Sequence, residues 1–364
     1  MELKYRVISE IDDFCSIAEQ WDCLLEVSDA NSIFLTYDWI STWVSISDID
    51  LSICTITIYD NEKLVGIAPF YKSSLRLCGV IKFNCLRIMG DNNSSAEYQD
   101  LIIHPGYESA VIGKIAEAIR ELPDKNSFFW VPYSSEQSGA SDRFQKLFKL
   151  MSCITRDRGF EYYKITLPKT KTDFDRALTS KQRNNIRRYK KKLTQNARIE
   201  AVNLADHESA NVAVAILKKL HNLNWNARGQ EGVFDRKPQF KSFITAYSKI
   251  AKEKHQLMAI CLIRENEPIA IRFGYHYNSV FYELQAGYNP DYNGSGICAI
   301  DFAIEFAIKN EIGTYDFLAF AGDYKQRFNA QPQPGRSYFA SCGSLFPRLV
   351  NYLGFWPTGK YISV

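Results

Sequence analysis

The chain has 364 residues, 46% hydrophobic and 23% charged, a composition typical of globular proteins that excludes disordered and fibrous classes. Its 44 basic and 41 acidic side chains give a net charge of +3, which argues against a global attraction to nucleic acid or anionic lipid. At about 100 to 200 residues per domain, this length predicts two domains.

The N-terminal segment, residues 1–14, carries acidic side chains where a signal peptide would be apolar. Every apolar run in the chain is also interrupted well before the roughly 18 residues that a membrane span needs. We therefore expect a cytoplasmic protein without a transmembrane helix. The nine cysteines contain no C-x-x-C pair and no zinc-ligand spacing, so we interpret them as reduced, mostly buried residues and expect no metal site.

Two regions, one in each half of the chain, show similar features in the same order. Each has two β-rich segments around a polar turn, which predicts a hairpin, at residues 53–72 and 257–276. Each hairpin is followed by a Glu-x-Gln motif, a strand and a proline, at residues 97–105 and 283–290. The shared order indicates an internal duplication.

The second part of the repeat is a helix followed by an aromatic strand. Apolar stripes predict helices over 109–121 and 296–310, and the aromatic strands are predicted at 127–131 and 314–318. Hairpin, strand, helix and strand in duplicate predict two α/β domains, joined near residues 166–172.

The second copy has a glycine loop, Asn293-Gly294-Ser295-Gly296, directly before its helix. Glycines allow main-chain N–H groups to point at an anion at a helix N-terminus, where the macrodipole also favours negative charge. The loop is therefore a candidate phosphate site, although the same residues are also typical of a simple turn. Within the helix, Asp301, Glu305 and Lys309 recur at i, i+4 and i+8, which we interpret as a solvated stripe rather than a catalytic carboxylate pair.

A basic segment covers residues 173–198. Thr172 and Asp175 resemble a capping box that would start its helix. Its cations are Lys181, Arg183, Arg187, Arg188, Lys190, Lys191, Lys192 and Arg198. This run is either a solvated face or an anion site.

Two further segments stand out by composition. His221, Asn224, Trp225 and Arg228 fall on one stripe if the segment after Ala210 stays helical, which suits a polar, ring-shaped ligand, although a lone histidine is also often structural. The C-terminal segment 345–356 is apolar with basic spots. It could contact a membrane surface or a second copy, but packing on the second domain is the favoured interpretation.

Several of these motifs, in this order, resemble the GNAT acyltransferase superfamily, specifically its duplicated branch of CelD-like and FemAB-like proteins. The segments that carry the resemblance are 34–43, 64–71, 180–188, 220–229, 283–290, 315–318 and 324–325. The chain departs from the family at Ala321 and Gly322, where acidic residues are common, and its loop lacks the Arg/Gln-x-x-Gly-x-Gly form of simple GNAT enzymes.

The resemblance implies an α/β (α+β) fold of two tandem GNAT-like domains, each a mixed, mostly antiparallel sheet flanked by helices. We expect a degenerate N-terminal domain over 1–166 and a C-terminal acyltransferase domain over 173–364, with 173–198 as its basic helical segment. The implied reaction moves an acyl group, acetyl first, from acyl-CoA to the amine of an amino sugar or amino acid in cell-surface polysaccharide or envelope biosynthesis. The alternatives are a FemAB-type transferase that depends on aminoacyl-tRNA, and a non-catalytic protein that binds an anionic polymer.

Direct attack by an amine needs a proton acceptor, for which Glu283 is the first choice and Asp316 the second. Main-chain N–H groups near residues 286–288 would polarise the thioester carbonyl, and the hydroxyls of Tyr288 or Tyr324 would assist the leaving thiolate. In the competing interpretations, Glu283 pairs with Arg272 across the sheet, Asp316 anchors the following turn, and both tyrosines are rim residues.

The binding assignments combine the glycine loop, the stripe after Ala210 and the basic segment with this resemblance. The expected donor-binding residues are Gln285, Ala286, Gly287, Asn293, Gly294, Ser295, Gly296 and Lys325. The expected acceptor-binding residues are His221, Trp225, Arg228, Arg183 and Arg187. The basic segment would hold coenzyme A phosphates, a polyanionic saccharide, a lipid-linked acceptor or, in the FemAB-type alternative, the tRNA backbone.

Overall fold

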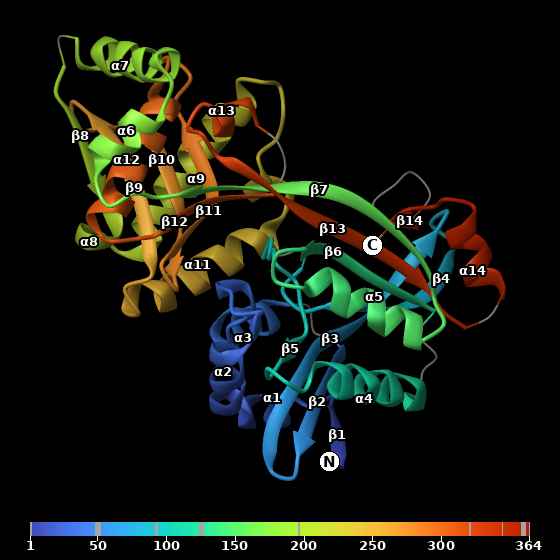
Figure 1. Cartoon of the computed structure of the whole chain (residues 1–364). Coiled ribbons are helices and arrows are strands. Elements are labelled where there is room, and N and C mark those ends of the chain that lie inside the picture. Colours follow the sequence, from blue (N-terminus) through green and yellow to red (C-terminus); the bar gives the residue numbers. More distant parts are fainter. Residues whose placement is uncertain are drawn as a thin grey trace. The chain divides into compact units, whose positions relative to one another are not determined.

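The computed structural model describes residues 2–47, 52–91, 94–123, 127–195, 197–319, 322–343, 345–357 and 362–363. The chain forms two compact units, Met1–Phe160 together with Pro334–Val364, and Glu161–Gln333. Strands and helices occur in both units (Figure 1), which confirms the predicted α/β class.

The sheet of the first unit runs in the order β1-β2-β3-β4-β6-β13, with β5 and β14 paired to β3. Its strands are β1 (Leu3–Ile8), β2 (Ser52–Asp60), β3 (Lys63–Leu77), β4 (Ile81–Ile88), β5 (Ile102–Ile103), β6 (Phe128–Ser135), β13 (Gln331–Ser341) and β14 (Ile362–Ser363). Its helical segments are α1 (Ile11–Ser16), α2 (Ala18–Val27), η1 (Ile33–Leu35), α3 (Tyr37–Ile46), α4 (Glu108–Glu121), α5 (Ala140–Leu150) and α14 (Leu345–Tyr352). The β4–β6 pair is parallel and the other pairs described in this unit are antiparallel.

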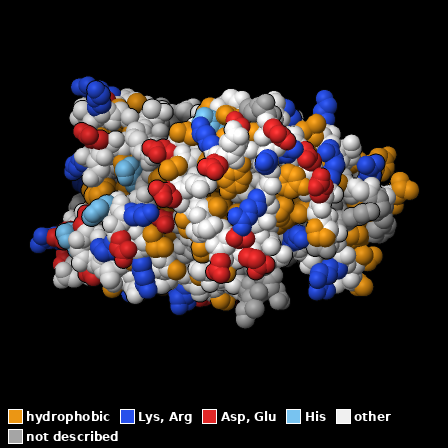
Figure 2. Space-filling model, turned by 90° about the horizontal axis from the view of Figure 1, so that it is seen from below, with side chains coloured by type: hydrophobic (Ala, Val, Ile, Leu, Met, Phe, Trp, Pro, Cys, Tyr) orange, Lys and Arg blue, Asp and Glu red, His pale blue; other side chains and the backbone are white. Residues whose placement is uncertain are grey.

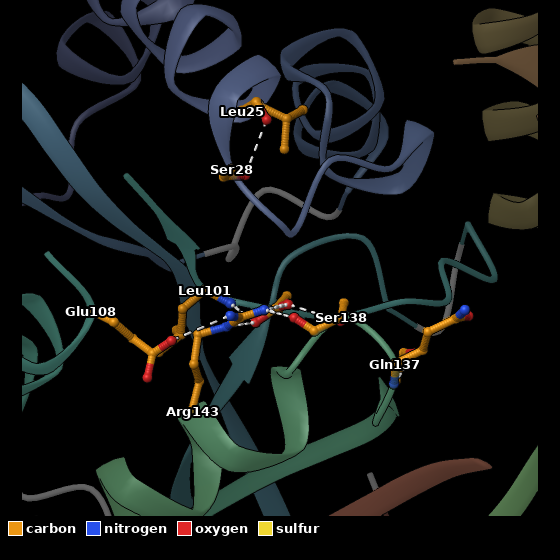
Figure 3. A network of polar contacts seen from close by, with 9 residues as sticks. Leu25, Ser28, Leu101, Glu108, Gln137, Ser138 and Arg143 are labelled. Carbon is orange, nitrogen blue, oxygen red and sulfur yellow. Dashed lines mark hydrogen bonds and ion pairs between the residues drawn. The ribbon is translucent and has the colours of Figure 1, made fainter. Parts of the chain in front are cut away.

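The core of the first unit lies between α4, α5 and the sheet. The predicted stripe of α4, Ile112, Ile115 and Ile119, is buried against side chains of the strands and α5. A buried ion pair anchors the first turn of α5, because Arg143 donates to both oxygens of Asp100 at 2.9 and 2.6 Å (Figure 3). A buried charge pair of this kind needs both partners, because removing one leaves the other unpaired in the core.

The sheet of the second unit runs in the order β8-β9-β10-β11-β12, followed by the C-terminal part of β7. Its strands are β7 (Ile154–Thr166), β8 (Ile199–Asn203), β9 (Leu257–Arg264), β10 (Glu267–Tyr277), β11 (Val280–Tyr288) and β12 (Thr314–Ala319). Its helices are α6 (Lys171–Ala177), α7 (Ser180–Thr194), α8 (Leu204–His207), α9 (Ala210–Asn226), α10 (Val233–Arg236), α11 (Pro238–Glu253), α12 (Ser295–Lys309) and α13 (Asp323–Gln326). The β11–β12 pair is parallel and its described neighbours are antiparallel.

Most of the predicted repeat is present in both units. The hairpins are β2–β3 and β9–β10, the helices are α4 and α12, and the aromatic strands are β6 and β12. The expected match between the two Glu-x-Gln motifs is wrong. By pairing, β4 is the counterpart of β11, whereas Glu97 and Gln99 follow β4 and lie outside any strand.

The C-terminal segment belongs to the first unit. Residues 335–341 of β13 pair antiparallel with residues 128–135 of β6. Val350 and Trp356 pack with Phe128 and Trp130 in one buried cluster. The units therefore differ from the predicted 1–166 and 173–364 boundaries, and the segment 345–356 packs on the first unit rather than on the second.

Two cysteines correct the expectation of reduced thiols. Cys153 and Cys342 form a disulfide within the first unit, with their Cα atoms 4.5 Å apart and 189 residues between them in sequence. It connects the start of β7 to the residue after β13. The remaining cysteines are free.

No described helix is both long and apolar enough to cross a membrane.

We expect replacement of Cys153 and Cys342 together by serine to lower the free energy of unfolding of the first unit by about 2 to 4 kcal/mol, because the bridge closes a long loop. Urea denaturation of the oxidised proteins measures this effect. Cys23→Ser, at an exposed free thiol, is the control and should leave the midpoint unchanged. Equal midpoints for the double variant and the wild type would contradict the expectation.

Candidate functional site

Strand β11 separates from β12 part-way along its length. Its antiparallel register with β10 extends from Val280 to Tyr288. Its parallel register with β12 covers only residues 280–282 against 314–316. The segment 283–288 therefore lies beyond the fork between the two strands, and the predicted N–H donors near residues 286–288 are on this segment.

The turn after β12 is built around a buried lysine. Leu318 has a left-handed backbone with φ +60°, and its N–H donates to the Asp316 carboxylate at 2.8 Å. The Lys325 ammonium donates to the carbonyls of Phe317, Leu318 and Ala319 at 3.0, 3.2 and 3.0 Å. A left-handed conformation is costly for leucine, so these contacts hold an unfavourable turn in place.

This geometry decides between the interpretations of two predicted residues. Asp316 is buried and bonded to the turn that follows it, in agreement with the interpretation that it anchors this turn. An ammonium has three N–H donors, and three main-chain oxygens accept from Lys325. The assignment of Lys325 to donor phosphates does not fit this arrangement. The predicted family departure at Ala321 lies outside the described residues.

Glu283 and Arg272 form the centre of the site. Arg272 Nη1 lies 3.0 Å from one oxygen of Glu283, and the Tyr315 hydroxyl donates to the other. Arg272 Nη2 donates to the carbonyl of Gly296 at 2.8 Å. Both charged side chains are buried. The cross-sheet pairing of Glu283 with Arg272 is thus present, and Arg272 also connects β10 and β11 to the first turn of α12.

Tyr324 lies against this ion pair. The Arg272 guanidinium is 5.6 Å from the centre of the Tyr324 ring. Burial, and to a lesser extent the Glu283 charge, raise the pKa of Tyr324 to about 12. Burial likewise raises the pKa of Tyr315 far above its ordinary value, again with Glu283 contributing. Both phenols therefore remain protonated at neutral pH and can donate hydrogen bonds.

The loop before α12 is shaped by glycine. Gly294 has φ +90°, and a β-carbon there would overlap the ring of Tyr189 on α7. At Gly296 a β-carbon would lie 3.1 Å from the ring of Tyr288. Ser295 is fully buried and its hydroxyl has no hydrogen-bond partner. Asn293 is exposed. The loop thus holds the N-terminus of α12 close to Tyr288 and Arg272.

Helix α9 packs against the end of β11. A β-carbon at Gly287 would overlap the main chain of Leu220 and His221. The His221 ring lies 3.0 Å from the Ala286 carbonyl through Nδ1, while Nε2 accepts from the Val233 N–H at 3.3 Å. Burial lowers the pKa of His221, so the ring is neutral at neutral pH. Both ring nitrogens contact the main chain, which agrees with the structural interpretation of this histidine.

The end of α9 brings three predicted residues together. Arg228 donates to the Tyr288 hydroxyl at 3.1 Å, and its guanidinium lies 5.8 Å from the centre of the Trp225 ring. Trp225 is half-buried and Arg228 is exposed. These side chains supply a ring face, a hydroxyl and a charge next to the glycine loop.

The basic segment forms two helices that are anchored to α12. Helix α6 is capped by Thr170 and not by the predicted Thr172, while Thr179 and Gln182 form the capping box of α7. Asp301 is buried and pairs with both Lys171, at 3.0 Å, and Lys190. The interpretation of Asp301 as solvated is therefore wrong.

Two of the three arginines predicted to bind the acceptor, Arg183 and Arg187, are on α7. The Arg183 guanidinium donates to main-chain carbonyls at the end of α6, including that of Asp175 at 3.1 Å. Arg187 is on the exposed face of α7. The sequence pattern missed Tyr315 and Tyr189, because an alternating aromatic strand and one tyrosine in a basic helix carry no signal for these contacts.

Residues 180–326 match the family model described as acetyltransferase (GNAT) domain. This span contains the fork, the glycine loop, the Arg272–Glu283 pair and α13. This segment of the second unit therefore carries a GNAT-type domain. The resemblance noted from the sequence is thereby confirmed for residues 180–326, and a GNAT domain supports an acyltransferase.

Solved structures show the same tandem GNAT fold over nearly the whole chain. FemX matches with a TM-score of 0.61 at 9% identity, over 92% of this chain and 97% of that chain. A tandem GNAT protein from the clavulanic acid biosynthesis pathway gives 0.50 at 10%, over 93% and 98%. The C-terminal domain of a putative lysylphosphatidylglycerol synthetase from Agrobacterium fabrum gives 0.52 at 10%, over 93% and 95%. No curated protein matches by sequence.

The described residues contain no group of three or more histidine, cysteine, aspartate or glutamate side chains placed to hold a metal ion.

We expect Lys325→Met to lower the free energy of unfolding of the second unit by about 2 to 4 kcal/mol, because three buried carbonyls would lose their donor. Chemical denaturation without any ligand measures this loss. Lys309→Met is the matched control, since Lys309 is exposed and pairs with Glu305 one turn away; it should cost under about 0.5 kcal/mol. A stable Lys325→Met protein that merely binds donor more weakly would restore the phosphate assignment.

Proposed function

We propose that this GNAT protein transfers an acyl group from acyl-CoA to an amine, with the donor bound in the second unit. The observation that supports this most directly is the fork between β11 and β12, which lies beside the glycine loop of α12. Arg272 bonds both to Glu283 of β11 and to the Gly296 carbonyl of α12. A thioester placed along residues 283–288 would have its reacting carbonyl next to main-chain donors. Its phosphates would then lie toward the start of α12.

The N-terminus of α12 has the physical properties of a phosphate site. The helix is 15 residues long and has no acidic residue in its first turn, so its macrodipole is not neutralised there. Its glycines are half-buried, and the buried, unpartnered hydroxyl of Ser295 is on this turn. Asn293 and residues 294–296 remain our candidates for the donor phosphates, and Gln285, Ala286 and Gly287 for the thioester arm.

The proposed reaction is a direct transfer. The amine nitrogen attacks the thioester carbonyl, the new C–N bond forms, and the C–S bond breaks. The proton lost by the amine passes to Glu283, directly or through water, since each carboxylate oxygen keeps a second lone pair beside its present bond. Tyr324, protonated at neutral pH, gives a hydrogen bond or its proton to the departing thiolate.

The acceptor assignment uses the surface at the end of α9. Trp225, Arg228 and Tyr288 combine an aromatic face with polar groups, which suits an amino sugar or an amino acid. We propose such an amine from cell-surface polysaccharide or envelope biosynthesis as the acceptor. This pathway assignment rests on the family resemblance alone.

The first unit supports an architectural role. At its equivalent fork, Gln99 bonds twice to Tyr133 of β6, through its N–H at 2.7 Å and its side-chain oxygen at 3.2 Å. The first turn of α4 also carries Glu108, which would repel phosphate. The segment around Gln99 thus pairs with β6 at this fork, and we propose that the first unit binds no donor.

A second donor, aminoacyl-tRNA, is favoured by the outer face of α7. Residues 176–199 contain no acid. The exposed cations of the helix lie on one arc, namely Lys181, Arg187, Arg188, Lys191 and Lys192. Such a row suits a polyphosphate backbone, and its affinity would fall steeply with salt.

We expect acetyl-CoA to bind the wild-type protein saturably in calorimetry, and Gly296→Asp to weaken this binding at least tenfold, since a carboxylate at the helix start repels phosphate (roughly 1.4 kcal/mol or more). Ser109→Asp is the matched control, because Ser109 occupies the same second position in α4. The control should bind like wild type.

The same titration separates the alternatives. No acetyl-CoA binding by the wild type, together with salt-sensitive binding of charged tRNA that Lys191→Gln with Lys192→Gln weakens, would replace acyl-CoA by aminoacyl-tRNA. Polymer binding without turnover of either donor would favour a non-catalytic protein.

We expect Tyr324→Phe to lower kcat about tenfold to a hundredfold without changing the affinity for acyl-CoA, because only the proton donor to the thiolate is lost. The rate of thiol release from acyl-CoA, at saturating concentrations of an amine acceptor, measures kcat. Tyr292→Phe is the control, since that hydroxyl bonds Glu267 on the surface.

The pH profile adds a second readout for Tyr324. A phenol with its pKa raised to about 12 is protonated below that pH and loses its proton only above it. Ionisation of Tyr324 should therefore not reduce the wild-type rate up to about pH 10, where an ordinary tyrosine is half ionised. A tyrosine-dependent fall in kcat below that pH would contradict the assignment.

A further inference from the structure

The C-terminal helix α14 presents an apolar row to solvent that the proposed reaction does not use. Its members, with their exposed fractions, are Leu345 (85%), Leu349 (48%), Tyr352 (78%) and Leu353 (60%). Their spacing of i, i+4, i+7 and i+8 places them on one side of the helix. Single exposed leucines are ordinary, whereas a contiguous row marks an interaction surface.

The opposite side of α14 fixes the helix to the first unit. Val350 is buried in the cluster that includes Leu75 and Trp130. The fully buried Asn351 amide donates to the carbonyls of Ile154 at 2.7 Å and Phe339 at 3.1 Å. The outward orientation of the leucines is therefore set by packing on the inner side.

A second apolar element lies close to this row. The turn between β3 and β4 exposes Val80 (80%) and Ile81 (44%). The strand ends beside it, at Leu75 and Leu77, share one buried cluster with Val350. Figure 1 draws α14 next to β4 and β14, and Figure 2 shows hydrophobic side chains gathered at the same right-hand edge.

The apolar row is bordered by cations. Arg156 donates to the Asn351 carbonyl at 3.1 Å, and the Arg158 guanidinium lies 4.2 Å from the centre of the Trp356 ring. The acid between them, Asp157, is paired with Arg336. Residues 63–90 contain no acid at all. The exposed cations on the flanking segments are Arg76, Lys82, Arg156 and Arg158.

We propose that this surface, the apolar row of α14 with the turn at Val80 and Ile81 and the bordering cations, binds the headgroup region of an anionic phospholipid bilayer. Leucine side chains would enter the boundary between headgroups and acyl chains, while the arginines and lysines contact lipid phosphates. The protein's net charge of +3 is small, so the attraction comes from this local arrangement.

The charges also argue against a second copy of the chain as the occupant. In a two-fold symmetric dimer the same patch meets itself. The cations at its border would then face like charges across the interface, which is unfavourable. An anionic bilayer satisfies both the leucines and the cations.

Vesicle co-sedimentation tests the proposal with the full chain. We expect the wild type to bind vesicles of phosphatidylcholine and phosphatidylglycerol, and to bind vesicles of phosphatidylcholine alone at least tenfold more weakly. Leu345→Gln with Leu349→Gln should weaken binding to the anionic vesicles by about tenfold or more, because two leucines no longer insert. Ile11→Gln with Val27→Gln is the matched control, since both residues are half exposed on the first unit but outside this surface.

Charge is tested in the same way. Arg76→Gln with Lys82→Gln should weaken binding and reduce its salt dependence, whereas Lys191→Gln with Lys192→Gln removes the same charge from α7 and should not. Thermal unfolding of each variant confirms that it is folded. The proposal would be overturned if the wild type did not bind anionic vesicles, or if both charge pairs had equal effects. It would also be overturned by a wild-type dimer that Leu345→Gln with Leu349→Gln dissociates.

Discussion

The second unit depends on one buried cation, the Arg272 guanidinium. A charge in this position is tolerated only when it is paired and hydrogen-bonded, and its partners come from three elements: Glu283 on β11, the Gly296 carbonyl on α12, and the ring of Tyr324 on α13. The strand that would hold a thioester, the helix start that would hold phosphates, and the proton donor are thus positioned by a single side chain. Glu283 consequently has a structural duty whether or not it also accepts a proton.

A buried charge also determines where the basic segment is attached to the second unit. Asp301 binds two lysines, one from each helix of the basic segment, and Tyr189 of α7 lies over Gly294. The inner side of α7 is therefore coupled to the glycine loop, while its outer cations stay in solvent. A polyanion on that outer arc would contact the helix that covers the proposed donor loop.

Local sequence patterns were sufficient for much of the fold and for the position of the site. Periodicity and turn chemistry predicted both hairpins, α4 and α12, and the glycines before α12 marked its start correctly. Most of what failed depended on contacts between residues distant in sequence. Nothing local to residues 334–364 shows that β13 pairs with β6, that Cys342 meets Cys153, or that α14 packs on the first unit. Lys325 was misassigned for a similar reason, since an exposed and a buried lysine look alike until the left-handed turn at Leu318 is known.

The two units suggest how a duplicated fold can keep one site. Both retain a parallel strand pair, β4–β6 or β11–β12, that ends early and opens a fork. In the first unit Gln99 bonds to the edge of β6 at this fork, and Glu108 adds negative charge to the following helix. In the second unit the corresponding helix start has glycines and no acid, and an arginine lies beneath it. The two forks therefore differ in the loop after the strand, while the parallel strand pair that supports each of them is retained.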